Sequence, residues 1–541
     1  MERLVLENLR LEALEGEEVL PARVAAALGL RPEDLGRVEV VRKALDARRK
    51  RDIHWRLHVA VEVADAREAE RLVRAGRLRR PERARTKDAP DLEVVDGVPH
   101  GAEPLGAPPV VVGSGPAGLF AAWLLAREGY APLVLERGPA VGPRVRQVHA
   151  FDRGGPHDPE ANILFGEGGA GTFSDGKLTT RTRSPLVGLV HDLLVAAKAP
   201  PEIKVASKPH VGTDRLRAVL VTLRRQLEAL GARFRFGARV EELLLDGEGA
   251  ARGVRLEGGE EVPAGAVLLG IGHSARDTYE RLHAQGVLLE PKPFQLGLRI
   301  EHPQELIDRA QLGPLAGQLP AAEYVLNHRR RGVYSFCMCP GGTIMASVSE
   351  PGFLCTNGMS RRRRDSGWAN SGLMVTCDPA TFDGGRGHPL AGVELQRRLE
   401  ARAFALGGGD YRLPAQRADD FLRARRSDPA GLRSSYPRGL RSADVREVLP
   451  PGAAEAIAAA LRAFDRRIPG YAGGAGLLVG PESRGSAPVR VPRHERTRVA
   501  LRTPGLYPMG EGAGYAGGIV SAAIDGLRSA AALVRARAPA G

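Results

Sequence analysis

Cysteine, lysine and aromatic side chains are scarce in this sequence of 541 residues. The four cysteines (Cys337, Cys339, Cys355, Cys377) form no Cys-x-x-Cys pair and no Cys/His metal spacing. They therefore fit a reducing compartment and predict no metal site. Aromatic residues make up 5% of the chain, and only eight of its 78 basic residues are lysine. The net charge is +14, but stacking side chains do not interleave with the basic ones, which disfavours nucleic-acid binding.

Long apolar runs are also lacking. Stretches such as "VLLGIG" are too short to span a bilayer. The first residues, "MERLVLENLRLEALEGEE", carry acidic side chains where a signal peptide has basic and then apolar ones. We therefore expect a cytoplasmic protein that has no membrane partner and, at this length, two or three domains.

The first hundred residues predict a small α+β domain. "VLPARVAAALGL" has the apolar spacing of a helix, and "VEVVRKALDARR" and "IHWRLHVAVEV" have the pattern of strands. The turn between these two strands, "ARRKRD", is very basic. The charged, proline-bearing stretch over residues 74–93 is typical of an exposed linker.

A strand, a glycine turn, a helix and a second strand follow over residues 108–138. In the turn, Gly113 permits a sharp bend, Gly115 lets the backbone approach a pyrophosphate, and Gly118 allows close packing of helix and strand. The start of the predicted helix, over Leu119–Arg127, offers free N–H groups to phosphates. Glu136 ends the second strand, where its carboxylate can bind a ribose diol and repel the 2′-phosphate of NADP. These features predict a dinucleotide site.

Two later segments distinguish the possible dinucleotides. "AGAVLLGIGHSARD" and "LYPMGEGAGYAGGIVSAAIDG" both have the pattern of strands that return to the cofactor, and the second continues into a final helix. This order resembles the glutathione-reductase-like flavoproteins, and the resemblance implies FAD. No second glycine fingerprint is followed by an acid-bearing strand, so no dedicated NAD(P)H domain is predicted, although transient binding of NAD(P)H stays open.

Seven longer motifs, in order, cover nearly the whole chain. They are "FGEGGAGTFSDGKLTTR" (Phe165–Arg181), "KPHVGTD" (Lys208–Asp214), "GIGHSARDT" (Gly270–Thr278), "FQLGLRIEHPQ" (Phe294–Gln304), "YSFCMCPGG" (Tyr334–Gly342), "ESRGSAPVR" (Glu482–Arg490) and "GEGAGYAGGI" (Gly510–Ile519). With these motifs the chain resembles a bacterial family of uncharacterised FAD-dependent dehydrogenases. The resemblance implies an oxidoreductase and names no substrate.

The expected fold is α/β. It consists of a small N-terminal α+β domain (1–100), a Rossmann-like FAD domain of the glutathione-reductase type in two pieces (101–291 and 493–541), and an inserted mixed α+β substrate domain (292–492). The oligomeric state is left open.

The cofactor-binding residues expected from the motifs and the resemblance lie in the glycine turn, at the end of the second strand and in the later loops. They are Gly113, Ser114, Gly115, Pro116, Ala117, Gly118, Glu136, Arg137, Arg144, Gly169, Gly171, Thr172, Val240, Gly272, His273, Gly510, Glu511, Gly518 and Ile519. Arg144 is placed on the pyrophosphate by the resemblance and by charge complementarity.

Candidates for the chemistry are Asp175 and Lys177, which could bind a substrate or move a proton, and Tyr515, which could face the flavin edge. For Cys337 and Cys339, buried or substrate-lining thiols are favoured over a redox pair, since redox pairs beside flavin are normally spaced more widely.

The predicted activity is hydride transfer between flavin N5 and a small organic substrate. Two alternatives stay open. One is a flavin-bound nucleic-acid-binding or RNA-modifying protein that uses the basic N-terminal block, and the other is a flavin monooxygenase.

Overall fold

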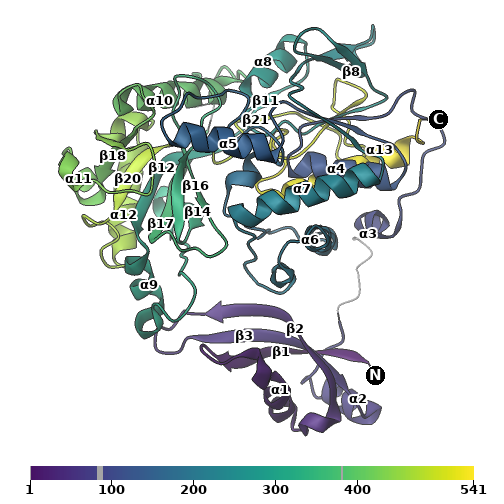
Figure 1. Ribbon diagram of the computed structural model, residues 1–541, viewed down its shortest axis with the longest axis vertical. Helices are drawn as coiled ribbons and strands as arrows, with labels where there is room; N and C mark the ends of the chain where they lie inside the picture. The colour runs from purple at the N-terminus through teal and green to yellow at the C-terminus, as the bar shows by residue number, and fades with distance from the viewer. Residues whose placement is uncertain (1, 82–88, 379, 381, 541) are drawn as a thin grey trace.

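The computed structural model describes residues 2–81, 89–378, 380 and 382–540. Its first unit is a three-stranded antiparallel sheet in the order β1-β3-β2, with two helices on the face that points away from the rest of the molecule (Figure 1). Its elements are β1 (Arg3–Glu12), α1 (Leu20–Leu28), β2 (Leu35–Asp46), β3 (His54–Val63) and α2 (Ala66–Arg74). The helix and the two strands predicted here are confirmed. The predicted linker lies partly outside the described residues, and its last residues begin α3 (Ala89–Asp96).

The second unit is a parallel five-stranded sheet in the order β22-β10-β4-β5-β6, the Rossmann-like sheet that the sequence predicts. Its strands are β4 (Val110–Val112), β5 (Leu133–Glu136), β6 (Arg233–Phe236), β10 (Val267–Leu269) and β22 (Leu506–Pro508). Every residue of β4 and β10 is buried, as expected for parallel strands covered on both faces. The two late segments therefore do return to the first strand, because β10 pairs with both β4 and β22.

Helices cover both faces of this sheet. They are α4 (Pro116–Arg127), α5 (Val141–Asp152), α6 (Leu186–Ala196), α7 (Thr213–Ala229), α8 (Arg276–Ala284) and α13 (Ile519–Ala536). α4 begins three residues before the predicted Leu119, because Pro116 suits the first position of a helix. α13, from the end of the chain, packs beside α4 (Figure 1). Two small sheets complete the unit, formed by β7 (Val240–Leu245), β8 (Ala251–Leu256) and β9 (Glu261–Pro263), and by β11 (Glu290–Pro291) and β21 (Val489–Arg490).

The third unit is a mixed seven-stranded sheet in the order β13-β14-β17-β12-β20-β18-β19. Its strands are β12 (Phe294–Pro303), β13 (Asn327–His328), β14 (Val333–Cys339), β17 (Trp368–Cys377), β18 (Leu413–Arg417), β19 (Leu440–Ser442) and β20 (Leu477–Glu482). The hairpin β15 (Gly342–Ala346) and β16 (Thr356–Ser360) lies beside it, and its helices are α9 (Gln304–Leu312), α10 (Ala391–Gly407), α11 (Ala418–Leu422) and α12 (Ala453–Asp465). The structure thus has the α/β fold expected, with a parallel sheet and a mixed sheet.

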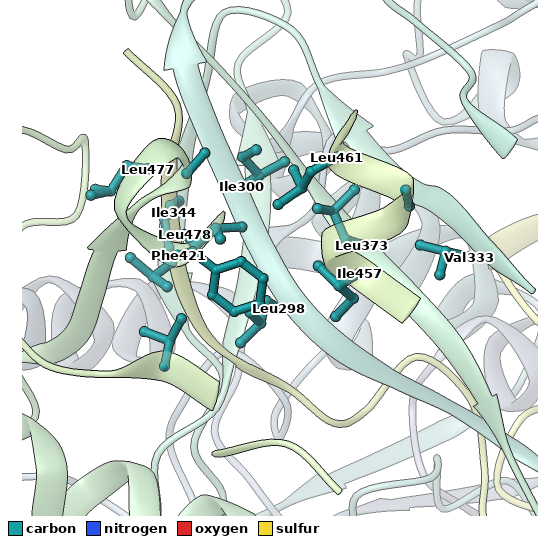
Figure 2. Packing of buried hydrophobic residues seen from close by; sticks show 14 of the residues in the cluster. Leu298, Ile300, Val333, Ile344, Leu373, Phe421, Ile457, Leu461, Leu477 and Leu478 are labelled. Atoms are coloured by element: carbon teal, nitrogen blue, oxygen red, sulfur yellow. The ribbon is translucent and has the colours of Figure 1, made fainter. Parts of the chain in front are cut away.

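The largest apolar core belongs to this third unit. Leu298 and Ile300 of β12 and Leu373 of β17 pack against Ile457 and Leu461 of α12, and all five side chains are fully buried (Figure 2). The core fixes β12 and, beside it, β20, whose carboxyl end reaches the site described below. Among the described residues, no helix combines the length and apolar character needed to cross a membrane.

Candidate functional site

A cavity of about 440 Å³ lies where the carboxyl ends of the parallel strands meet β14 and β20 of the mixed sheet. This volume falls in the usual range for small-molecule sites. Residues of the glycine turn, of the loop after α5 and of the segment before α13 line one part of it, and residues of β14, β16 and β20 line the other. Ligands of open α/β sheets bind at this edge.

The glycine turn has the shape that a pyrophosphate requires. Gly113 has φ +95°, and a Cβ atom on Gly118 would lie 1.9 Å from the Gly113 carbonyl oxygen, so both positions need glycine for the fold. A Cβ atom on Gly115 would meet no described atom within 4 Å and would instead extend into the cavity. No described side chain caps the start of α4, which leaves its first N–H groups for a ligand.

Glu136 lines the cavity, but its carboxylate already accepts four hydrogen bonds within the protein. Ser114 donates its N–H (2.9 Å) and hydroxyl (2.7 Å) to one oxygen, and the N–H groups of Gly138 (3.1 Å) and Gly166 (3.0 Å) donate to the other. A carboxylate has about four acceptor sites. A ribose diol could therefore bond Glu136 only by replacing one of these donors, which the sequence did not indicate.

Arg144 does not reach the cavity, contrary to the expectation of a phosphate contact. It is fully buried and donates to the carbonyl oxygens of Asn162, Gly166 and Glu167 and to the hydroxyl of Thr172. Burial lowers the pKa of its guanidinium to about 9. Arg144 and Thr172 thus hold the shape of the loop from behind and do not line the site.

Arg137 does line the cavity, as do Arg239 and Arg484. Its guanidinium bonds Glu160 and Asp277 in bidentate fashion, at 2.7–3.0 Å, and stacks 4.0 Å from the centre of the Phe165 ring. These contacts tie β5 to the start of α8 and fix the wall of the cavity nearest the end of β5.

The C-terminal loop brings Gly510, Glu511, Gly518 and Ile519 to the cavity. Glu511 accepts a hydrogen bond from the N–H of Gly518, and its other oxygen lies 3.5 Å from Nε2 of His273. Burial lowers the pKa of His273, against the opposing charge of Glu511. Glu511 thus places a carboxylate at the start of α13.

Tyr515 lies outside the cavity, so the structure does not support the catalytic role predicted for it. Its hydroxyl accepts a hydrogen bond from the N–H of Arg493 (3.2 Å), and the Arg493 guanidinium lies 3.9 Å from the ring centre. Of the other predicted residues, Ser114 and Gly118 also lie outside the lining, next to Gly113. The remaining predicted cofactor residues, together with Asp175 and Lys177, line the cavity.

Asp175 and Lys177 form an ion pair of 2.7 Å at the cavity, and Arg364 binds the same carboxylate oxygen at 3.0 Å. Asp175 is buried, and among the described residues its second oxygen, Oδ1, has no hydrogen-bond partner. Burial alone would raise the pKa of Asp175, but the charges of Lys177 and Arg364 outweigh it and lower that pKa. The carboxylate therefore stays ionised and has a free acceptor.

The mixed sheet contributes a second charged pair, which the sequence did not predict. Glu482, at the end of β20, pairs with the fully buried Arg299 of β12 (2.6 Å), and Arg299 also donates to Asn370 (2.7 Å) and Asn357 (3.2 Å). Burial raises the pKa of Glu482 to about 7, against the charge of Arg299. Glu482 opens the motif "ESRGSAPVR", but only the pairing of β20 with β12 turns it toward the cavity.

In the described part of the chain, no group of three His, Cys, Asp or Glu side chains is placed to bind a metal ion. The cavity offers glycine backbone at one end, and fixed charges and the Cys337 thiol at the other.

Comparisons with known proteins agree with this architecture. Residues 293–485 match the family model of the FAD-dependent protein C-terminal domain, residues 111–172 match an NAD(P)-binding Rossmann-like domain, and residues 1–62 match a domain of unknown function. An uncharacterized protein of Clostridium beijerinckii is 42% identical over 534 residues, which is 97% of each chain.

Solved structures resemble the chain more distantly. A 3-ketosteroid-Δ4-(5α)-dehydrogenase from Rhodococcus jostii RHA1 is 13% identical over 80% of this chain and 98% of its own, with a TM-score of 0.32. GidA from Aquifex aeolicus is 13% identical over 80% of this chain and 64% of its own, with a TM-score of 0.31. On the strength of the clostridial relative and the two domain models, the chain belongs to a family of FAD-dependent proteins that carry a Rossmann-like nucleotide-binding domain.

Proposed function

We propose that this protein is an FAD-dependent oxidoreductase that transfers a hydride between FAD and a small organic substrate. The observation that carries the proposal is the single cavity that joins the glycine turn of the parallel sheet to the charged side chains of the mixed sheet. One end suits a pyrophosphate, and the other suits a reacting centre.

The residues present fit FAD. The space beside Gly115, the uncapped N–H groups of α4 and the lining segment from Gly510 to Ile519 would hold the phosphates and the ribityl chain. When bound, FAD supplies the two-electron chemistry, and the protein supplies position and charge. Glycines at 169, 171 and 176 let the loop over the cavity approach the ring closely.

Two carboxylates at the reacting end have different roles. Asp175 stays ionised beside Lys177 and Arg364, so its free Oδ1 binds a donor group of the substrate. Glu482 titrates near neutrality, which suits a group that takes a proton from the substrate as hydride leaves. Lys177 and Arg299 fix the position of the two carboxylates.

Glu482→Gln is expected to lower the rate of cofactor reduction about a hundredfold, the usual scale for one proton-transfer group. In the unaltered protein the rate should rise as the pH rises through about 7, because Glu482 then loses its proton and becomes a base. The variant should show no inflection in this range. Stopped-flow reduction between pH 5 and 9 measures both effects, and an unchanged inflection in the variant would exclude Glu482 as the base.

Anaerobic reduction of the purified, FAD-loaded protein by a panel of metabolites, with NADH and NADPH included, tests the function. Bleaching of the flavin absorbance by at least one organic compound is the expected result. Fast oxygen consumption that depends on NAD(P)H and a substrate would instead indicate a monooxygenase, and failure to take up FAD would overturn the proposal.

A further inference from the structure

β14 is irregular at Cys337. This residue has φ +45°, which a non-glycine residue adopts only at a cost in strain. The pairing of β14 with β17 shifts at the same point, because Phe336 lies opposite Gly372 and Cys339 lies opposite Asn370. Two residues of β14 therefore face one residue of β17, which is a β-bulge. Bulges beside active sites redirect a side chain, and here the redirected residue lines the cavity.

The bulge also brings two thiols together. In a regular strand, residues two apart lie about 6.6–6.8 Å from each other, at the upper limit for a disulfide. The positive φ of Cys337 and the bulge bend the strand between these two residues. The Cys339 thiol is fully buried and donates to the Cys337 carbonyl oxygen (3.2 Å), and its sulfur is near enough to the Cys337 sulfur to influence that group's pKa.

The surroundings favour a thiolate at Cys337. The hydrogen bond from Cys339 and the charges of Lys177 and Arg299 lower the pKa of Cys337, although burial and Asp175 oppose them. The same hydrogen bond, together with burial, raises the pKa of Cys339. The charged and titratable groups that act on the pair are Lys177, Asp175, Arg299 and Glu482. One sulfur is thus prepared as the nucleophile, and the other keeps its proton.

The other two cysteines provide a contrast within the same chain. Burial raises the pKa of Cys355 to about 11 and that of Cys377 to about 12. Neither lines the cavity, and neither has a positive φ. Strain, exposure to the cavity and nearby cations therefore single out Cys337.

We propose that Cys337 and Cys339 are a redox-active pair that cycles between a dithiol and a disulfide at the reacting end of the cavity. On oxidation the S–H bond of Cys339 breaks and one S–S bond forms. The thiolate and thiol together release two electrons and one proton, the equivalent of a hydride, which the flavin accepts. This step rests on the proposed function, and it implies that thiols or disulfides belong to the substrate class.

The pair itself is tested on the full-length protein by counting thiols. After diamide treatment and denaturation, two of the four cysteines should resist maleimide, and mass spectrometry of peptides should find Cys337 bonded to Cys339. The Cys377→Ser variant, a matched control, should form the same disulfide. If diamide leaves all four thiols free, or bonds Cys337 to anything except Cys339, the pair does not exist.

The nucleophile is tested by alkylation with iodoacetamide at different pH values. Cys337 should react with an apparent pKa well below the ordinary value of about 8.5. Lys177→Gln should raise this apparent pKa by about one unit, because it removes a positive charge that favours the thiolate. A Cys337 that titrates at or above the ordinary value would overturn the assignment. This measurement on the unaltered protein stands even if a variant fails to fold.

Exchange with the cofactor is tested by anaerobic dithionite titration of the FAD-loaded, oxidised protein. The unaltered protein should take up two more electrons per chain than Cys337→Ser. Equal uptake would exclude the pair. A chain that forms the disulfide but never binds FAD would refute the proposed function and leave the thiol pair, so the two failures are distinguishable.

Discussion

Replacing Gly115 with alanine is expected to weaken FAD binding about a hundredfold, or about 2.7 kcal/mol, while the protein stays folded. A Cβ atom at this position meets no described atom within 4 Å, so the fold has room for it. The backbone there has φ −70°, which alanine adopts without strain. The methyl group would occupy the space in which backbone and pyrophosphate must approach each other.

Titration calorimetry with FAD measures the affinity, and urea unfolding measures the stability. Gly188→Ala is a matched control, because Gly188 lies on the exposed surface of α6, a Cβ atom there also meets no described atom within 4 Å, and the residue is remote from the cavity lining. The control should bind FAD normally. Equal affinities of Gly115→Ala and the control would show that the glycine turn does not hold the phosphates.

Replacing Glu400 with alanine is expected to cost about 3–5 kcal/mol of unfolding free energy, the usual effect of breaking a buried ion pair from one side. Glu400 lies on α10, is fully buried, and binds Arg276 of α8 (2.6 and 3.0 Å) and Arg484 (2.8 and 3.1 Å). Both guanidiniums are themselves buried, so the variant leaves two positive charges without this partner. Arg484 also lines the cavity, so FAD affinity should fall as well.

The pH dependence of this effect has a definite sign. Burial would raise the pKa of Glu400, but the charges of Arg276 and Arg484 outweigh it and lower that pKa to about 2. The stabilisation is therefore complete above the ordinary glutamate value of about 4.3 and is lost as the pH falls toward 2. Urea unfolding of the unaltered protein and of Glu400→Ala should be compared from pH 8 to pH 3. The difference between their unfolding free energies should be constant and shrink only at the acidic end.

Glu394→Ala is the control for this prediction, because Glu394 lies on the exposed face of the same helix. Its effect should stay within about 0.5 kcal/mol. If Glu400→Ala were no more destabilising than this control, the buried network would not join α10 to α8.

The nucleotide-binding half of the fold could be predicted because its signals are local. The glycine turn and the all-apolar β4 and β10 each lie within one short segment, and the structure has them where the sequence indicates. The directions of Arg144, Thr172 and Tyr515 could not be predicted, because a loop or an ion pair closed by distant residues decides them.

The reacting end of the cavity depends even more on long-range pairing. Glu482 reaches it through the register of β20 on β12, and Cys337 reaches it through a bulge opposite Ser371 of β17. Neither register can be derived from a single segment, since a shift of one residue turns the side chain to the other face. The two closely spaced cysteines are visible in the sequence, but the bulge that turns Cys337 toward the cavity is not.

Whether this cavity holds FAD is measured by the cofactor content of the purified full-length protein. The protein is saturated with FAD, freed of unbound cofactor and then denatured. Absorbance and chromatography of the released cofactor should give one FAD per chain. A folded protein that stays colourless and releases no FAD after this treatment would show that the cavity does not hold this cofactor.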